Sequence, residues 1–377
     1  MNKKFLILIG LIILIIVVFG ISYIAINKRN SNENNLNKSE AIQNDLNVPL
    51  NENPPKSTEG LTIVPTMQDT ITANSAWCGT FQLVWNDVKN ELAKQDIILT
   101  PNQPVMATNL NKEEFNESML SDEYYYKKYG IITPALKEEI KQGILDKFNQ
   151  TSDILDDFDW NLNIDGNKYL FYTMLYRKFD FLQPFDKLTN DKFGNYNNIA
   201  YFGITDKNTN GIIRNQIHVL YYNSQDDFAI EIDTKTNDEV IFCKNPTGNT
   251  FKEIYDNMNT KASNYTGNTA FGDVDEFKAP NLTFNELREY TELEGKQFPT
   301  ANYGPKDIIK ALQTIQFSLN ENGGEIKSEA GMEMMDGITL DQPRYFYVDN
   351  TFAIFLREKG KSLPYFAGKI DDITKFQ

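Results

Sequence analysis

The alternation of hydrophobic and polar side chains is clearest near the end of the chain. Along residues 312–320, Ile315, Phe317 and Leu319 occupy alternate positions, and mostly polar side chains lie between them. A period of two is typical of a β-strand with one buried and one exposed face. We therefore predict a strand here whose odd-numbered positions face a core.

A second alternation follows the two glycines that come after this strand. From residue 324 to residue 334 the even positions carry small or apolar side chains, whereas Glu325, Lys327 and Glu329 lie between them. The period is again that of a strand with one face suited to burial. The pattern fits an exposed extended segment and equally a strand that is already part of a sheet, so the sequence leaves both open.

The remaining elements follow from the same two periods. Apolar side chains at helical spacing predict helices over residues 81–92, 134–148 and 251–258. The run at residues 169–176 is continuously apolar and aromatic, which is typical of a strand buried on both faces. The predicted strands outside the first two alternations are residues 97–99, 169–176, 217–222, 228–232, 240–243, 277–284, 351–356 and 363–370.

The N-terminal end has a different pattern, because residues 5–26 carry no charge and form enough apolar chain to cross a bilayer as a helix. No small-residue cleavage site ends this run, so we interpret it as a retained signal-anchor with the N-terminus inside. The chain then divides into a cytoplasmic tail at 1–4, a transmembrane helix at 5–26, a flexible Asn-, Ser- and Pro-rich stalk at 27–60 and a folded domain at 61–377.

The net charge of the chain argues against two classes of binding partner, nucleic acids and anionic lipids. The 377 residues carry a net charge of −15, and acidic residues are spread along the whole sequence. Nucleic-acid binding needs basic patches, and so does attachment to anionic lipid, so we expect neither. Two cysteines do not make a disulfide framework, and the sequence does not say whether Cys78 and Cys243 pair. Cys243 lies in a strand-like run, where a buried free thiol is favoured.

Candidate catalytic and metal-binding residues are few. His218 is the one histidine and lies within an apolar strand, where packing is the more common role. Residues 206–211 have the first half of a calcium-loop spacing, but position twelve is Ile217 instead of the bidentate Glu. Residues 161–166 form a similar fragment with Tyr172 at position twelve. We therefore expect no enzymatic activity, no metal and no cofactor.

Four short motifs occur in a fixed order along the second half of the chain. The last reads Phe-Ala-Gly-Lys-Ile at residues 366–370, at a set spacing after Phe352. The others are Pro184-Phe185 after the strand at 169–176, the hairpin at 217–232 and residues 277–284. In the order of these motifs the sequence resembles the serpins. The resemblance implies a divergent, membrane-anchored bacterial member of the serpin-like proteins. The resemblance covers most of residues 168–370, whereas residues 65–167 match poorly.

The resemblance implies an α+β fold in which a mixed central β-sheet is accompanied by further sheets and surrounding helices. It also implies that residues 323–340 form a reactive loop. In inhibitory serpins a protease cuts this loop, and the freed hinge inserts as a new strand into the central sheet, which requires small or apolar side chains at alternate positions. The implied hinge and loop residues are Gly323, Gly324, Ile326, Ser328, Ala330, Met335, Gly337, Ile338, Leu340 and Asp341.

The sequence also departs from the inhibitory pattern. The sheet-opening positions, which the family fills with Asn and His, correspond to Thr173 and Gln313. Glu325 and Lys327 stand where an inhibitory hinge usually has Thr and alanines. Counting forward from Gly323 places the cut bond at 337–338, whereas counting back from Pro343 places it at 340–341, so no specificity residue can be assigned.

These departures favour one of two functions. We expect an extracellular, membrane-anchored, non-inhibitory interaction or structural module of the serpin type. The alternative is an inhibitor that traps an extracellular serine or cysteine protease by inserting its loop. In either case the expected partner is an extracellular protease or another surface protein.

Overall fold

The computed structural model describes residues 57–161, 168–205, 211–322 and 342–377. These residues belong to one compact unit of the chain. The predicted cytoplasmic tail, membrane helix and most of the stalk lie outside them, as does the alternating segment at 324–334. Within the described ranges, no helix is long and apolar enough to cross a membrane. The described part has the α+β composition with several sheets that the sequence predicts.

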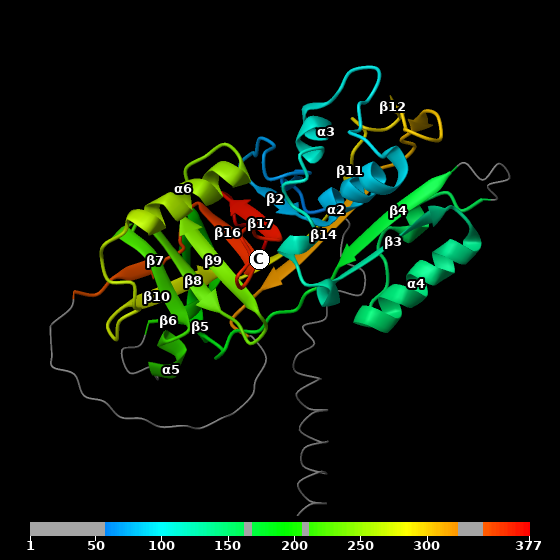
Figure 1. Ribbon diagram of the computed structural model, residues 1–377. Coiled ribbons are helices and arrows are strands. Elements are labelled where there is room, and N and C mark those ends of the chain that lie inside the picture. Colours follow the sequence, from blue (N-terminus) through cyan, green and yellow to red (C-terminus); the bar gives the residue numbers. More distant parts are fainter. Residues whose placement is uncertain (1–56, 162–167, 206–210, 323–341) are drawn as a thin grey trace, which may run out of the picture. The chain divides into compact units, whose positions relative to one another are not determined.

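The largest sheet has seven strands in the order β1-β2-β17-β16-β9-β8-β7 (Figure 1). β1 pairs with β2 in parallel, and every other neighbouring pair is antiparallel, so the sheet is mixed. The predicted C-terminal hairpin supplies its two middle strands. The strands are β1 (Thr62–Ile63), β2 (Ser75–Cys78), β7 (Ile217–Ser224), β8 (Asp227–Asp233), β9 (Asp238–Lys244), β16 (Phe352–Glu358) and β17 (Phe366–Ile370).

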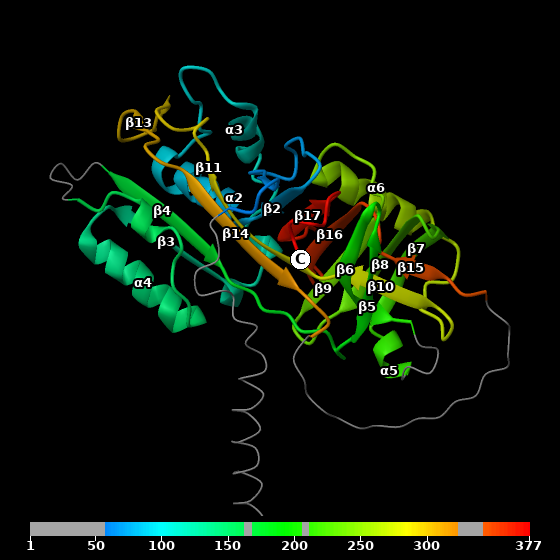
Figure 2. The ribbon, with the colours of Figure 1, turned by 180° about the vertical axis from the view of Figure 1, so that it is seen from behind.

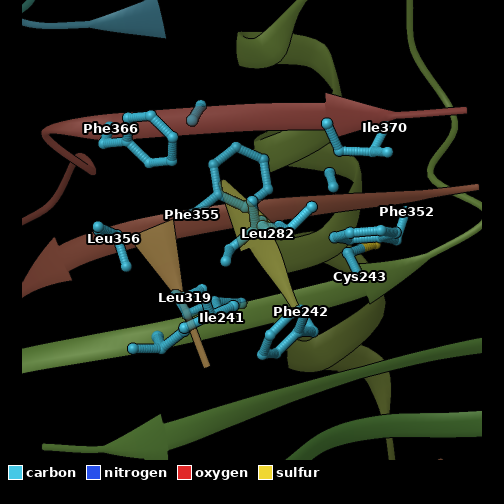
Figure 3. Packing of buried hydrophobic residues seen from close by; sticks show 14 of the residues in the cluster. Ile241, Phe242, Cys243, Leu282, Leu319, Phe352, Phe355, Leu356, Phe366 and Ile370 are labelled. Carbon is cyan, nitrogen blue, oxygen red and sulfur yellow. The ribbon is translucent and has the colours of Figure 1, made fainter. Parts of the chain in front are cut away.

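The middle of this sheet is the main core of the protein. All seven residues of β9 are buried, and six of the seven in β16 are. The helix α6 (Phe251–Asn264) lies across β7, β8 and β9 and buries Phe251, Ile254, Tyr255 and Met258. Figure 3 shows Ile241 and Phe242 of β9 beside Phe352 and Phe355 of β16. Burial of this much apolar surface makes the sheet the element that the other parts pack against.

A second sheet of four strands has the order β15-β10-β6-β5. Its aromatic side chains join it to the larger sheet, because Phe277 of β10 lies 6.0 Å from Phe242 of β9 between ring centroids. Gly203 of β6 permits a very close approach, since a Cβ there would lie 1.9 Å from the Phe277 carbonyl oxygen. The strands are β5 (Asp186–Phe193), β6 (Tyr196–Ile204), β10 (Glu276–Pro280) and β15 (Tyr345–Tyr347).

Two pairs of long strands form separate two-stranded sheets. β11 (Leu282–Glu289) pairs with β14 (Leu312–Leu319), and β3 (Tyr125–Ile131) pairs with β4 (Tyr169–Leu175), all antiparallel. In both views β14 and β4 are neighbours (Figures 1 and 2). The helix α4 (Pro134–Phe148), predicted with these bounds, packs on the β3–β4 pair.

Smaller elements complete the described part of the chain. The predicted helix at 81–92 is an α-helix, α2, that continues as a π-helical stretch. These elements are α2 (Thr80–Asp87), the π-helical Val88–Ala93, α3 (Val105–Leu110), α5 (Gly211–Arg214), β12 (Gln297–Phe298), β13 (Lys306–Asp307) and 3₁₀ turns at Glu117–Met119, Asp122–Tyr124 and Leu155–Asp157.

Several sequence predictions need correction. Residues 277–284 are not one strand, because the chain breaks at Asn281 and enters two different sheets as β10 and β11. Residues 97–99 are buried at Ile97 and Leu99 but form no strand. The strand at 169–175 is not buried on both faces, since its side chains alternate between buried and half-buried from Tyr169 to Tyr172. Its strand partner β3 was not predicted.

The strand predictions at 169–176 and 312–320 are confirmed as β4 and β14. Among the described residues β4 pairs with β3, and β14 pairs with β11. The mixed sheet and the further sheets that the resemblance implies are both present.

Candidate functional site

The candidate site begins with two strand edges. β14 pairs with β11 along its whole length, from Leu282 opposite Leu319 to Glu289 opposite Leu312. β4 pairs with β3 in the same complete way. Among the residues that the structure describes, neither β14 nor β4 has a strand on its second edge. An unpaired edge can accept a further strand through its backbone N–H and C=O groups.

The end of β14 is anchored where it approaches residues 323–341. The Glu321 carbonyl accepts a hydrogen bond of 3.0 Å from the Phe185 amide. The Glu321 side chain is buried and lies 2.9 Å from the ammonium of Lys187, which is 78% exposed. An ion pair with such an exposed partner contributes little energy, so the backbone bond is the main anchor.

The chain is anchored again where it returns. Arg344 donates hydrogen bonds to Asp275, including one of 2.6 Å from Nη2, and to the carbonyl oxygen of Asn268. Burial lowers the pKa of the Arg344 guanidinium, but the bonds to Asp275 outweigh it and the pKa is raised. β15 then pairs in parallel with β10. The described residues on either side of 323–341 therefore lie next to strands of two different sheets, β14 and β15, and are held there by hydrogen bonds.

The predicted hinge and loop residues belong to this connection. All ten lie outside the described residues, and so do both candidate positions for the cut bond. These residues are Gly323, Gly324, Ile326, Ser328, Ala330, Met335, Gly337, Ile338, Leu340 and Asp341.

The side chain of Gln313, a predicted sheet-opening residue, is buried on the inner face of β14 and is held there by hydrogen bonds. Its Oε1 accepts a 2.6 Å hydrogen bond from the Tyr290 hydroxyl. Its Nε2 donates to the Cys78 carbonyl oxygen at 3.0 Å and to Thr80 Oγ1 at 2.9 Å. Burial raises the pKa of Tyr290 far above its ordinary range, so this phenol stays a donor. Gln313 thus ties β14 to β2 and to the start of α2.

Thr173, the second predicted sheet-opening residue, lies on β4 opposite Lys127. Its hydroxyl is buried, and no described group hydrogen-bonds to it. Gln313 forms hydrogen bonds to other residues with both of its amide hydrogens and with its amide oxygen. Among the described atoms, no hydrogen bond joins Thr173 to Gln313. These two side chains therefore do not hold β4 to β14.

A buried charge cluster that sequence reasoning missed lies just beyond the end of β4. The Arg177 side chain is 1% exposed; its Nε lies 2.7 Å from Asp238 and its Nη1 2.9 Å from Glu358. Ser121 donates its amide to Glu358 at 2.9 Å. The guanidinium carbon lies 3.5 Å from the centre of the Tyr124 ring. The cluster joins the β3–β4 pair to β9 and β16.

The two carboxylates of this cluster differ in their proton affinity. Burial raises the pKa of Asp238 more than the bonds from Arg177 and its other neighbours lower it. Burial also acts on Glu358, but the hydrogen bonds from Ser121 and Arg177 outweigh it, so the pKa of Glu358 is lowered. The three side chains therefore form a buried ionic contact in which burial outweighs the hydrogen bonds at Asp238, whereas the hydrogen bonds outweigh burial at Glu358.

The residues considered for catalysis lie elsewhere. His218 Nε2 is 2.7 Å from Asp233, and the histidine side chain is 47% exposed on β7. Asp233 also pairs with Lys359. Cys243 is buried and free, as is Cys78, and burial raises the pKa of Cys243 to about 11, which keeps its thiol unreactive. These side chains form a surface ionic contact and two packed thiols.

Among the residues that the structure describes, no group of three or more His, Cys, Asp and Glu side chains is placed to hold a metal ion. The two partial calcium-loop fragments fall largely outside the described residues, at 206–210 and 162–167.

The chain has no match to known proteins by sequence but has matches among solved structures. No protein-family model and no curated protein matches the sequence. The chain is similar to solved structures of serpins. Thyroxine-binding globulin in complex with thyroxine shares 14% identity at a TM-score of 0.40, over 63% of this chain and 64% of that chain, less than two thirds of its length.

Two further solved structures cover more of their own chains. Serpin48, a highly specific serpin of the insect Tenebrio molitor, shares 11% identity at a TM-score of 0.46 and covers 80% of this chain and 92% of its own. Maspin shares 12% identity at a TM-score of 0.46, over 70% of this chain and 84% of its own. These are members of the family that the sequence motifs resemble.

Proposed function

We propose that this chain is a serpin-like protein without enzymatic activity that binds another protein through residues 323–341. The observation that carries the proposal is the anchoring of this segment at both ends, by Glu321 on one sheet and Arg344 on another. Fixing the residues that flank a binding segment reduces the conformational entropy that is lost when a partner binds it. The partner class is an extracellular protease or another surface protein.

The non-inhibitory form of this function is the one we favour. Gln313 uses its hydrogen bonds to fix β14 to α2 and β2, and Thr173 on β4 has no bond to it among the described groups. The hinge also carries Glu325 and Lys327 in place of small residues.

One observation favours the inhibitor as a second candidate. In the described residues β4 and β14 each have an unpaired edge, and β14 leads directly toward the hinge. A strand inserted between them would gain hydrogen bonds along both edges, each contributing about 1 kcal/mol. The even positions Gly324, Ile326, Ser328 and Ala330 would suit the buried face of such a strand.

The deciding experiment is incubation with a panel of serine and cysteine proteases. The favoured function predicts cleavage within residues 335–341 with no SDS-stable complex, and a melting temperature of the cut protein that is unchanged or lower. A covalent complex together with a large rise in melting temperature would contradict it and establish the inhibitor.

A variant sharpens the same test. Ile326→Pro removes a backbone donor at an alternate position of the hinge. In the inhibitor it should leave the uncut protein unaffected and abolish the rise in melting temperature after cleavage. If residues 324–334 are already a strand of a sheet, the uncut protein should lose about 3 kcal/mol. Ser328→Ala, which keeps the alternation, is the matched control.

We further propose that residues 5–26 anchor the protein with its folded domain outside the cell, because this span is long, uncharged and lacks a cleavage site. Protease treatment of intact cells should then release the folded domain. A mature N-terminus that begins after residue 26 would contradict the anchor.

A further inference from the structure

A cleft of about 590 Å³ lies beside the return point of residues 323–341. It is lined by Tyr222 and Asn223 at the end of β7, by the last turn of α6 and by the segment that follows α6. This volume falls in the range of small-molecule sites in proteins. The residues of the β4–β14 region do not contribute to it, so it is distinct from the candidate site above.

The walls of the cleft are polar, and their one charge is paired with a residue outside the lining. Lys261 is the one charged lining residue, and its ammonium lies 2.7 Å from Asp227 Oδ1. Asn223 donates to the other oxygen of Asp227 at 3.0 Å. None of the lining residues is aliphatic, so a purely aliphatic ligand would find little matching surface. An anion would compete with Asp227 for Lys261, and a cation would meet no lining carboxylate.

Two tyrosines line the cleft and are held in place by their neighbours. The Tyr222 ring lies 4.8 Å from Phe346 between centroids, and its hydroxyl accepts the Tyr345 amide at 3.3 Å. Tyr265 lies over the backbone of Gly267, where a Cβ would be 2.3 Å from the Tyr265 hydroxyl oxygen. The Tyr265 hydroxyl also acts on Arg344, since its hydrogen bond helps to raise the pKa of that guanidinium after the larger effects of burial and Asp275.

We propose that this cleft binds a neutral saccharide. The C–H faces of a sugar ring pack on aromatic rings, and its hydroxyl groups need side chains that both donate and accept hydrogen bonds. Tyr222 and Tyr265 supply the rings, whereas Asn223, Asn264 and Thr260 supply amides and hydroxyls. Because the Tyr222 hydroxyl accepts the Tyr345 amide, the cleft lies next to the described residues that follow 323–341. The proposal does not depend on the function proposed above.

The test is calorimetric titration of the full chain with neutral disaccharides, namely maltose, cellobiose and N,N′-diacetylchitobiose. An anionic heparin disaccharide is titrated in parallel. The proposal predicts measurable binding of at least one neutral sugar and none of the anionic one. Failure of all three neutral sugars to bind, or tighter binding of the heparin disaccharide, would overturn it.

Two variants locate the site. Asn264→Ala should weaken binding about fivefold, the effect of losing one neutral hydrogen bond, whereas Asn259→Ala on the same helix should not. Gly267→Ala should displace the Tyr265 ring and weaken binding more than Asn264→Ala does, whereas Gly211→Ala has open space around its added Cβ and should be silent. Equal binding by each variant and its control, at unchanged melting temperatures, would place the sugar elsewhere and refute the assignment.

Discussion

The two strand pairs that border the candidate site are attached to the protein in different ways. β11–β14 is part of the main core, because Phe317 stacks on Phe366 of β17 at 4.6 Å and Leu319 lies among side chains of β9 and β16 (Figure 3). β3–β4 instead buries Leu170 and Tyr172 in a separate core that it shares with α4. The site thus has one side that belongs to the main core and one side that is attached to it.

The attachment of β3–β4 relies strongly on polar contacts. Arg177 joins it to β9 and β16, and Lys127 joins β3 to Asp87 of α2 at 2.6 Å. Tyr169 and Phe171 add partly buried contacts with a third cluster. Polar contacts can be exchanged for water or weakened one at a time, whereas a shared hydrophobic core fails as a whole. The two sides of the site should therefore differ in how they open.

The largest loss of stability is expected from a substitution in β11–β14, the strand pair that belongs to the main core. Phe317→Ala removes a ring that packs on both Phe284 and Phe366, and should reduce the free energy of unfolding by about 3–5 kcal/mol. Because this ring belongs to the main core, urea unfolding should remain a single transition at a lower midpoint. Gln316→Ala, on the opposite face of the same strand, is the control and should be nearly neutral. Two separate transitions in Phe317→Ala would contradict the shared core.

The next largest loss of stability is expected from a substitution that weakens the attachment of β3–β4. Arg177→Met leaves Asp238 and Glu358 buried without their cation, which should cost about 3 kcal/mol. The loss should be local, so hydrogen exchange should accelerate in β3, β4 and α4 while β9 and β16 stay protected.

The control for this prediction removes the buried charges together. The triple variant Arg177→Met, Asp238→Asn, Glu358→Gln keeps the shapes without the unpaired carboxylates and should recover most of the stability. Uniform acceleration of exchange across both regions would show that β3–β4 is not a separately attached unit.

A smaller effect is expected at Gln313. Gln313→Leu leaves the Tyr290 hydroxyl buried without an acceptor and should cost about 1–3 kcal/mol. Tyr290→Phe in the same chain removes that orphaned hydroxyl and should restore part of the loss. A double-mutant cycle from urea midpoints measures the coupling. A coupling energy of zero would mean that Gln313 does not hold β14 through Tyr290.

The smallest effect is the pH dependence of the attached side, where the two carboxylates act with opposite sign. The pKa of Glu358 is lowered, so its contribution is present above its usual 4.5 and is lost as the pH falls through the folded value. The pKa of Asp238 is raised, so its contribution is present below its usual 3.8 and is lost as the pH rises through the folded value.

Two variants separate these contributions. On acidification below pH 4.5, Glu358→Gln should lose stability less steeply than the parent protein. On acidification from neutral pH, Asp238→Asn should lose stability more steeply. Urea midpoints across the pH range measure both slopes, and parallel curves for the two variants would contradict the opposite signs.

The sequence predicts local structure well where a single period persists. The burial of Gln313, Ile315, Phe317 and Leu319 in β14 is the predicted one, and α4 begins and ends where predicted. Gln313 could be found because it is the one polar residue at an odd position of an otherwise apolar face. These results depend on neighbours within a few residues, which the pattern records directly.

What the sequence did not predict depends on distant pairing. Arg177 meets partners 61 and 181 residues away, and no local pattern marks a charged residue as buried. β3 was missed because Lys127 and Lys128 interrupt its alternation, and its stability comes from its pairing with β4. The break at Asn281 separates two sheets with a single residue, which is too short a signal to read from hydropathy.

The position of the C-terminal hairpin has a consequence for the order in which the protein can fold. β16 and β17 lie between β9 and β2, so the seven-stranded sheet is completed by residues 352–370. During synthesis, β2, β7, β8 and β9 are made long before the strands that join them. Until residue 370 has been made, β2 and β9 each have a backbone edge without its partner strand, and these edges are open to wrong pairing. Folding of this domain therefore waits for the last strands to be synthesised.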